Sequence, residues 1–240
     1  MSETADGDDR PSVAVLAPDG EAADVAETVR AAGGDAATGI DAVGGADLAV
    51  ALGSAALADL AASDVSTAVF PASGEIELRD IGRILDGRYT VEERPLVAVS
   101  TAGESVHALY EITLTTAETA TISEFSLDRD GGSSVARFRA DGVTVTTPAG
   151  SRGYAHAVGG PVVAPGSDVL AVVPISPFAT DPDHWVLPLT ELSLTVERDD
   201  ADVELLADGQ VIETVEPKSA VRLTRAGTLP VASLPESGRE

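Results

Sequence analysis

The sequence contains no cysteine, a single lysine and few aromatic residues, which are 3% of the 240 residues. Without cysteine there is no disulfide, no thiolate nucleophile and no cysteine-ligated metal. With so few aromatic rings, the core must be built from Val, Leu, Ile and Ala, and hydrophobic residues are 44% of the chain. No apolar run reaches the roughly 18 residues that a membrane-spanning helix needs, so none is expected.

The chain begins with MSETADGDDR, a polar and acidic stretch. A secretory signal peptide has the reverse character, with a basic start and an apolar middle. We therefore expect a cytoplasmic protein, and we interpret residues 1–10 as a mobile tail.

Forty acidic residues oppose fifteen basic ones, giving a formal net charge of −25. Such a surface repels nucleic acids and anionic lipids, so neither is expected as a partner. A simpler reading is that the acidic surface keeps the fold soluble. The three histidines (His107, His156 and His184) lie far apart and lack metal-ligand spacing, so no metal site is expected from them.

From residue 11 to about 88, apolar strands alternate with amphipathic helices, a pattern typical of an α/β domain with a parallel sheet. Ser54 is a candidate N-cap for one of these helices. The expected strands are Ser12–Ala17, Asp47–Leu52 and Thr67–Phe70, and the expected helices are Glu21–Ala32, Ser54–Ala62 and Glu75–Leu85.

From about residue 89 to 228 helical periodicity nearly disappears, which predicts a β-sandwich domain followed by a tail over 229–240. Turns are expected at Asp130–Gly132 and at Asp208-Gly209, and one helix at Gly150–Val158. The expected strands are Leu96–Ser100, Val106–Thr115, Thr121–Leu127, Val135–Arg139, Val143–Thr147, Val169–Pro174, Leu192–Glu197, Val203–Leu206, Val211–Val215 and Ala220–Thr224.

Chemistry is expected where the strand Val143–Thr147 meets Pro148, which cannot continue a β-ladder. Ala149–Ser151 then opens the expected helix, whose first N–H groups have no internal partner and favour an anionic or polar ligand. Gly159–Pro161 ends that helix. A plain strand–turn–helix without a ligand is the alternative.

The segment RFRADGVTVTTPAGSRGYAHAVGGP, residues 137–161, resembles the dinucleotide-binding segment of the NAD kinases, DGxxxSTPTGSTAYxxSxGGPIV. HALYEITL, VVPISPFA and LADGQ resemble further family segments in the same order, so the resemblance covers about residues 96–226. The matching positions are Asp141, Gly142, Thr147, Pro148, Gly150, Ser151, Tyr154, Gly159, Gly160 and Pro161, with Glu111 on the family's glutamate.

The resemblance implies an α/β domain, a β-sandwich domain and a nucleotide site between them. It implies phosphoryl transfer from ATP or polyphosphate, with Mg²⁺, to the 2′-hydroxyl of NAD, and a homo-oligomer. Asp141, Ser151 and Tyr154 would line the dinucleotide site, with Glu111 near the adenosine ribose. Tyr154 as a packed helix residue and Asp141 as a turn residue are the alternatives.

One family hallmark is missing, because Leu52-Gly53-Ser54-Ala55 stands where the family has GGDG. The family's aspartate takes the proton from the 2′-hydroxyl, and a serine cannot act as a carboxylate base. General-base help is worth about 10²–10⁴ in rate, so no catalytic residue is assigned. Arg152 stands where the family has threonine, and either pairs with a ligand phosphate or is an exposed arginine beside surface acid.

The excess of Asp and Glu over Lys resembles the proteins of salt-accumulating archaea, so we interpret the chain as a divergent, haloarchaeal-like relative of the NAD kinases. Three functions stay open. The chain is a module that binds NAD or NADP without phosphoryl transfer, an active NAD kinase with a remodelled site, or a scaffold that pairs with a complete kinase.

Overall fold

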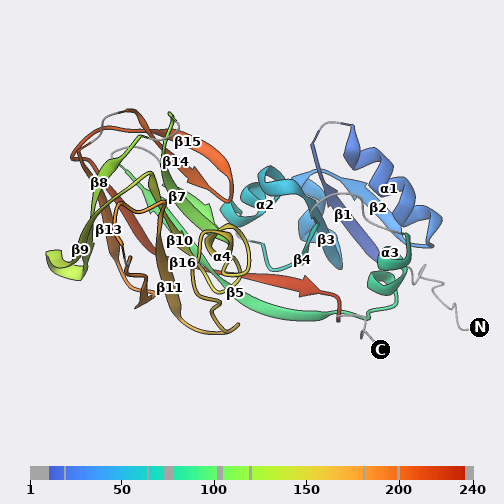
Figure 1. Ribbon diagram of the computed structural model, residues 1–240. Helices are drawn as coiled ribbons and strands as arrows, with labels where there is room; N and C mark the ends of the chain where they lie inside the picture. The colour runs from blue at the N-terminus through green and yellow to red at the C-terminus, as the bar shows by residue number, and fades with distance from the viewer. Residues whose placement is uncertain are drawn as a thin grey trace, which may run out of the picture. The chain divides into compact units, whose positions relative to one another are not determined.

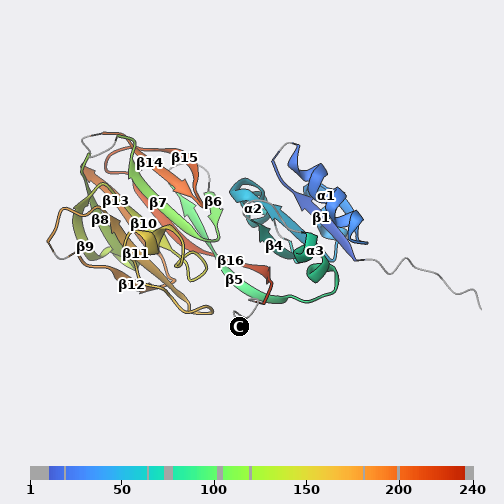
Figure 2. The ribbon, with the colours of Figure 1, turned by 45° about the vertical axis from the view of Figure 1, so that its right-hand side comes forward.

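The computed structural model describes residues 11–18, 20–63, 65–72, 78–101, 105–118, 121–180, 182–198 and 201–235. They form two compact units (Figures 1 and 2). The first contains the described residues up to Glu92 and those from Pro230 onward, and the second spans Glu93–Leu229. The first predicted domain was expected to end at 88, so the division lies four residues further along the chain.

The first unit is a parallel sheet with strands in the order β2-β1-β3-β4, and the end of β16 joins it beside β4. The elements are β1 (Ser12–Leu16), α1 (Glu21–Ala31), β2 (Asp35–Thr38), the 3-10 helix η1 (Ile40–Gly45), β3 (Leu48–Leu52), α2 (Gly53–Ala62), β4 (Ala68–Ala72) and α3 (Leu78–Leu85).

Side chains alternate between the two faces of this sheet, and each face is covered by helices. Val13, Val15 and Val50 point to one face, where they form a core with Val29 of α1 and Ile84 of α3. The other face carries the small side chains of strands β1 and β3 and is covered by α2 (Figure 1). The predicted α/β domain is therefore confirmed.

The second unit is a sandwich of two largely antiparallel sheets. One contains β8, β9, β13 and β16 together with β5 and β6, and the other has the order β12-β11-β10-β7-β14-β15. The strands are β5 (Thr90–Ser100), β6 (Ser105–Ala108), β7 (Glu111–Thr116), β8 (Ser123–Arg129), β9 (Ser133–Ala140), β10 (Gly142–Thr146), β11 (Val169–Ile175), β12 (Trp185–Pro188), β13 (Leu192–Arg198), β14 (Val203–Ala207), β15 (Gln210–Val215) and β16 (Ala220–Ser233).

The core of the sandwich combines the inner faces of both sheets, with Phe125 and Leu194 from one and Ile112, Val143 and Val172 from the other. All five side chains are fully buried. The predicted β-sandwich is confirmed, and apart from Phe125 the buried core cluster is aliphatic, as the shortage of aromatic residues indicated. Both predicted turns form, at the 3-10 helix η2 (Asp130–Gly132) and at Asp208-Gly209 between β14 and β15.

Several predicted boundaries are wrong. Ser54 is not the N-cap of α2, because the helix begins at Gly53 and Leu52 holds the capping position. The tail predicted from residue 229 is contradicted over its first residues, because β16 continues to Ser233 and Val231 pairs with Val69. The expected tail at 1–10 and residues 75–77 of the third expected helix lie outside the described residues.

The helix predicted at Gly150–Val158 is mostly a turn, because only α4 (Tyr154–Ala157) is helical. Gly153 has φ −88° and ψ −133°, far from helical values, and it precedes the first helical residue. The helix N-terminus expected at Ala149–Ser151 therefore does not exist, and the anion-binding argument based on it fails. The sequence also missed β2 and β12. Within the described residues, no helix has both the length and the apolar composition needed to cross a membrane.

Candidate functional site

Glu111 is the first residue of β7 and lies half-buried beside α4. Its carboxylate accepts a hydrogen bond from the backbone N–H of Ala155, while its second oxygen, Oε2, is buried with no hydrogen-bond partner. Burial raises the pKa of this carboxyl, and the negative charge of Asp208 raises it further. An unpaired buried carboxylate oxygen is costly, so this group is suited to a hydrogen-bond donor.

Tyr154 begins α4 with 44% of its surface exposed. Burial raises the pKa of its phenol, and the negative charge of Glu111 adds to that increase, so the two side chains lie close enough to interact. Arg152 is exposed two residues earlier. The structure thus brings Glu111, Tyr154 and the turn carrying Arg152 to one end of the sandwich.

In the 146–150 turn, Thr146, Thr147 and Gly150 pack against the bend at Leu109–Tyr110. The Thr147 hydroxyl donates to the Leu109 carbonyl at 2.6 Å, and the Thr147 N–H donates to the Tyr110 carbonyl at 2.9 Å. A Cβ at Gly150 would lie 2.3 Å from the Tyr110 carbonyl oxygen. Only glycine allows this approach, so the motif is needed for packing as well as for any ligand.

Ser151 is fully buried. Its hydroxyl accepts a hydrogen bond from the Val163 N–H at 3.0 Å and donates to the Pro148 carbonyl at 2.9 Å. Both contacts tie the turn to the segment that follows α4. The Ser151 hydroxyl therefore holds the turn together, and its place in the lining of the dinucleotide site stays a prediction.

Asp141 lies in the turn between β9 and β10, at the other end of β10 from the turn at 146–150. Thr146 pairs with Glu111, whereas Gly142 pairs with Thr115. At about 3.4 Å per residue, the five steps along the chain from Asp141 to Thr146 span roughly 17 Å. Asp141 is therefore not grouped with Glu111 and Tyr154 within one copy of the chain.

Asp208 also lies in this region, although the sequence predicted only a turn at this residue. Its side chain is buried, with 8% of the residue exposed, and its carboxylate accepts three backbone hydrogen bonds from residues 109–111. Burial raises its pKa, while the three N–H groups act in the opposite direction. The motif LADGQ was visible in the sequence, but its partners lie about 100 residues away and no local pattern reveals them.

The position of the missing GGDG motif is the junction of β3 and α2. Gly53 has φ +76°, a conformation that favours glycine, and no atom lies within 4 Å of where its Cβ would be. Leu52 is buried, whereas Ser54 is half-buried. The turn therefore keeps an open glycine but carries no carboxylate in its Leu52–Ala55 sequence. Among the described residues, no group of three or more His, Asp or Glu side chains is arranged to hold a metal.

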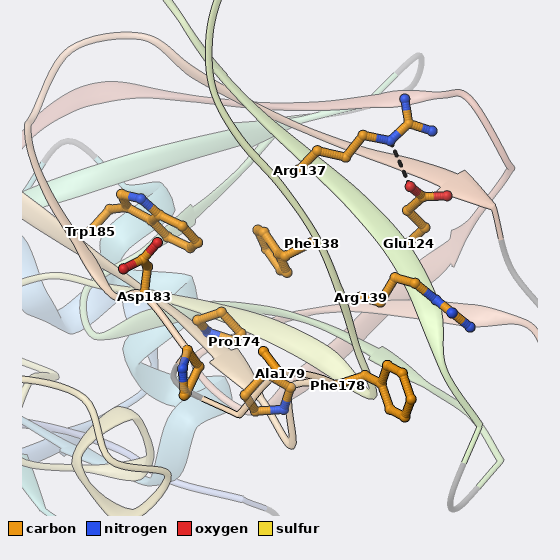
Figure 3. A pocket seen from close by; sticks show the side chains of 11 residues that line it. Glu124, Arg137, Phe138, Arg139, Pro174, Phe178, Ala179, Asp183 and Trp185 are labelled. Carbon is orange, nitrogen blue, oxygen red and sulfur yellow. Dashed lines mark hydrogen bonds and ion pairs between the residues drawn. The ribbon is translucent and has the colours of Figure 1, made fainter.

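A separate pocket of about 360 Å³ lies on the second unit and contains none of the predicted site residues (Figure 3). Phe138 stacks on Trp185 with ring centroids 5.3 Å apart. The Arg139 guanidinium carbon lies 5.5 Å from the centre of the Phe178 ring, which is at the rim. Two arginines, Arg137 and Arg139, line the pocket together with two acidic residues, Glu124 and Asp183, so the charges balance. The pocket is thus locally neutral and offers aromatic faces, which suit a planar, weakly polar group.

Comparisons with known proteins agree on one family. The family model described as the ATP-NAD kinase C-terminal domain matches residues 109–230, just over half of the chain. An NAD kinase of Pyrococcus furiosus is 33% identical over 149 residues, covering 61% of this chain and 53% of that protein. An NAD kinase of Methanosarcina mazei is 31% identical over 154 residues, covering 63% of this chain and 53% of that protein. The chain thus spans about half the length of the curated relatives it matches.

Two solved structures share the fold. An NAD kinase from Archaeoglobus fulgidus in complex with ATP superimposes with a TM-score of 0.70 and 23% identity, covering 94% of each chain. Yeast NADH kinase complexed with NADH gives a TM-score of 0.75 and 17% identity, covering 95% of this chain and 84% of the yeast chain. At these identities the likeness shows that the fold is the same.

Proposed function

Because this chain belongs to the NAD kinase family, we propose that it binds NAD or NADP through its second unit without transferring phosphate. Glu111 and Tyr154 form the centre of the proposed site, with Arg152 exposed beside them to meet a phosphate group. A similar protein was solved with NADH and another with ATP, so nucleotides suit this fold.

The observation that carries the proposal is the buried Oε2 atom of Glu111, which has no hydrogen-bond partner. A ribose hydroxyl is a donor of the kind that this oxygen lacks, and a hydrogen bond to a charged acceptor is worth about 1.5–3 kcal/mol. Tyr154, half exposed beside it, offers a ring face for an adenine or nicotinamide. Asp141 lies at the far end of β10. If it contacts the dinucleotide as predicted, it would contact a different part of an extended ligand from the part bound by Glu111.

Phosphoryl transfer is not expected, because the turn at Leu52–Ala55 contains no carboxylate. A 2′-hydroxyl is a weak nucleophile until a base removes its proton, and Ser54 is not such a base. The described residues contain no metal-holding group of three or more His, Asp or Glu side chains, and Mg²⁺ commonly binds through few protein ligands together with substrate phosphates, so Mg²⁺ is considered only with an ATP or polyphosphate substrate. We expect turnover, if measured, to be indistinguishable from that of a Glu111→Ala variant.

A scaffold role is the second candidate, because the 137–161 segment makes packing contacts and hydrogen bonds that stabilise the fold without a ligand. Gly142, Gly150 and Gly160 each have backbone or side-chain atoms within 2.8 Å of a built Cβ position, and Ser151 is committed to the turn. A chain that only paired with a complete kinase would keep these residues for packing. Such a chain has no use for a Glu111 carboxylate whose Oε2 atom has no hydrogen-bond partner.

Calorimetric titration of the full chain with NAD and with NADP, in molar KCl, tests the proposal. Binding of either, weakened about tenfold or more by Glu111→Gln, is the expected result. Glu216→Gln is the matched control, because Glu216 is an exposed glutamate at another place in the second unit. No heat with either dinucleotide on folded protein would contradict the binding proposal and favour the scaffold. NADP formation from NAD with Mg²⁺ and ATP or polyphosphate would contradict the loss of transfer.

A further inference from the structure

The carboxylate of Asp208 is held at a fixed place by its own turn. Asp208 and Gly209 have φ values of +46° and +80°, so both central residues of the β14–β15 hairpin are in the left-handed region. The Asp208 N–H donates to the carbonyl of Glu111 at 2.9 Å. The side chain then points back to the start of β7 and is nearly enclosed, with 8% of the residue exposed.

Three consecutive backbone N–H groups converge on this carboxylate. They belong to Leu109, at 2.7 Å, Tyr110, at 2.7 Å, and Glu111, at 2.8 Å. The β5–β6 ladder ends at Ala108 and the β7–β10 ladder begins at Glu111, so the first two N–H groups lie between strands. The carboxylate therefore supplies the acceptors that a neighbouring strand would otherwise provide.

The other side of the same bend holds the dinucleotide motif. The carbonyls of Leu109 and Tyr110 accept hydrogen bonds from the hydroxyl and N–H of Thr147, and the Tyr110 carbonyl also accepts from the Thr146 hydroxyl at 3.1 Å. A continuous set of bonds thus runs from Asp208 through the bend to the turn before α4. The side chain of Glu111 begins at the end of that bend.

We propose that Asp208 is the positioning residue of the dinucleotide site: its carboxylate fixes the 109–111 bend, and through it the Glu111 side chain and the 146–150 turn. The inference rests on the proposed function, because the site that Asp208 organises is the proposed dinucleotide site. Asp208 does not itself contact the ligand in this assignment.

A measurable consequence follows from charge. The negative charge of Asp208 raises the pKa of Glu111, and Glu111 in turn raises that of Tyr154. The groups facing this region are Tyr154 on α4, Tyr110 in the bend, Asp208 on the hairpin, and Arg94 on β5, which faces Tyr110. Besides burial, the negative charge of Asp208 raises the pKa of Glu111, so removal of that charge is expected to lower the pKa.

The test compares Asp208→Asn with Asp202→Asn, an exposed aspartate just before β14, in the full chain. The first readout is the pH titration of the Glu111 carboxyl by ¹³C NMR without ligand, with Glu111→Gln to assign the signal. Asp208→Asn is expected to lower the midpoint and Asp202→Asn to leave it unchanged. The second readout is Kd for the dinucleotide, expected to rise about tenfold or more for Asp208→Asn alone.

An unchanged Glu111 midpoint in folded Asp208→Asn protein would overturn the inference. Should that variant not fold, Asp208→Glu keeps the charge but displaces it by one methylene. It is then expected to retain a raised midpoint while Kd increases, and an unaltered Kd would overturn the inference. If the wild-type chain binds neither NAD nor NADP, the proposed function fails, while the ligand-free titration still decides whether Asp208 governs Glu111.

Discussion

At the scale of single residues, the 137–161 segment serves two purposes at once. Gly142, Gly150 and Gly160 are needed because carbonyl oxygens or side chains occupy the space of a Cβ. Glu111 and Tyr154, in contrast, present groups that the packing does not use fully, since one oxygen of Glu111 has no partner and 44% of Tyr154 is exposed. Packing explains the first set of residues, and a ligand is the economical explanation for the second.

Gly150→Ala is expected to destabilise the protein by about 1–3 kcal/mol, the usual cost of forcing extra atoms into a packed site. The added methyl would meet the Tyr110 carbonyl oxygen at 2.3 Å, and neither backbone segment can move freely. Chemical denaturation in molar KCl measures the loss. Gly44→Ala is the control, because no atom lies within 4 Å of its Cβ position and its φ is not in the left-handed region. Equal stability of the two variants would contradict the expected clash.

Glu111 should make stability fall as the pH rises. Its folded pKa is raised above the reference value of 4.5, first by burial and then by Asp208. A carboxyl with a raised folded pKa favours the folded state below the unfolded pKa, and this contribution is lost as the pH rises through the folded pKa. Urea unfolding of the wild type and Glu111→Gln, from pH 4.5 upward, measures it. The wild type should lose stability relative to the variant, and a constant difference would contradict the assignment.

At the scale of elements, the turn before α4 shows how tertiary contacts override local pattern. Residues 150–158 have helical spacing, yet only Tyr154–Ala157 is helical. Thr147 and Ser151 use their hydroxyls for carbonyls at Leu109 and Pro148, and these bonds hold the chain in a turn. Helix α3 is a simpler element. It contains Gly82, and no atom lies within 4 Å of the place where a Cβ at this residue would be.

Gly82→Ala is expected to stabilise the first unit by about 0.5–1 kcal/mol, because alanine loses less backbone entropy than glycine when a helix forms. The position has room for a methyl group, since no atom lies within 4 Å of the built Cβ. The melting temperature of the full chain should rise slightly. Gly87→Ala, just after the helix, is the opposing control, because Gly87 has φ +68° and alanine is strained there.

At the scale of the whole molecule, charge is the dominant feature. The formal net charge of −25 creates self-repulsion that opposes the compact state. Few ion pairs are available to offset it, because only fifteen residues are basic. Surface pairs such as Arg137 with Glu124 are exposed and screened by solvent, so they contribute little to stability. Screening by dissolved salt is therefore expected to matter more than any single contact.

The fold should become more stable as KCl is raised from 0.1 M to 2 M, because the Debye length falls from about 10 Å to about 3 Å near 1 M. Thermal unfolding followed by circular dichroism measures the melting temperature at each concentration. Sucrose at matched osmolality is the control for effects that do not depend on charge. Equal melting temperatures in dilute buffer and in molar KCl would contradict the role assigned to self-repulsion.

The fold class, the change from alternating strands and helices to a β-sandwich near residue 90, and the family could all be predicted from the sequence. These depend on periodicity and on local motifs, which are readable along the chain. The sequence also located Glu111 and Tyr154, because each lies in a motif with a recognisable form. The roles that the resemblance implies for Glu111, Asp141, Ser151 and Tyr154 stay predictions, as does the phosphate contact considered for Arg152.

The grouping of those residues depends on how distant strands pair, which the sequence did not reveal. The register of β10 separates Asp141 from Glu111, and hydrogen bonds between segments convert a predicted helix into a turn. The same is true of Asp208, whose three partners lie 97 to 99 residues away. A side chain's local sequence fixes its chemistry, whereas its partners depend on which distant strands pair. The identity of these residues could therefore be read in advance, but the bond between Asp208 and the 109–111 bend could not.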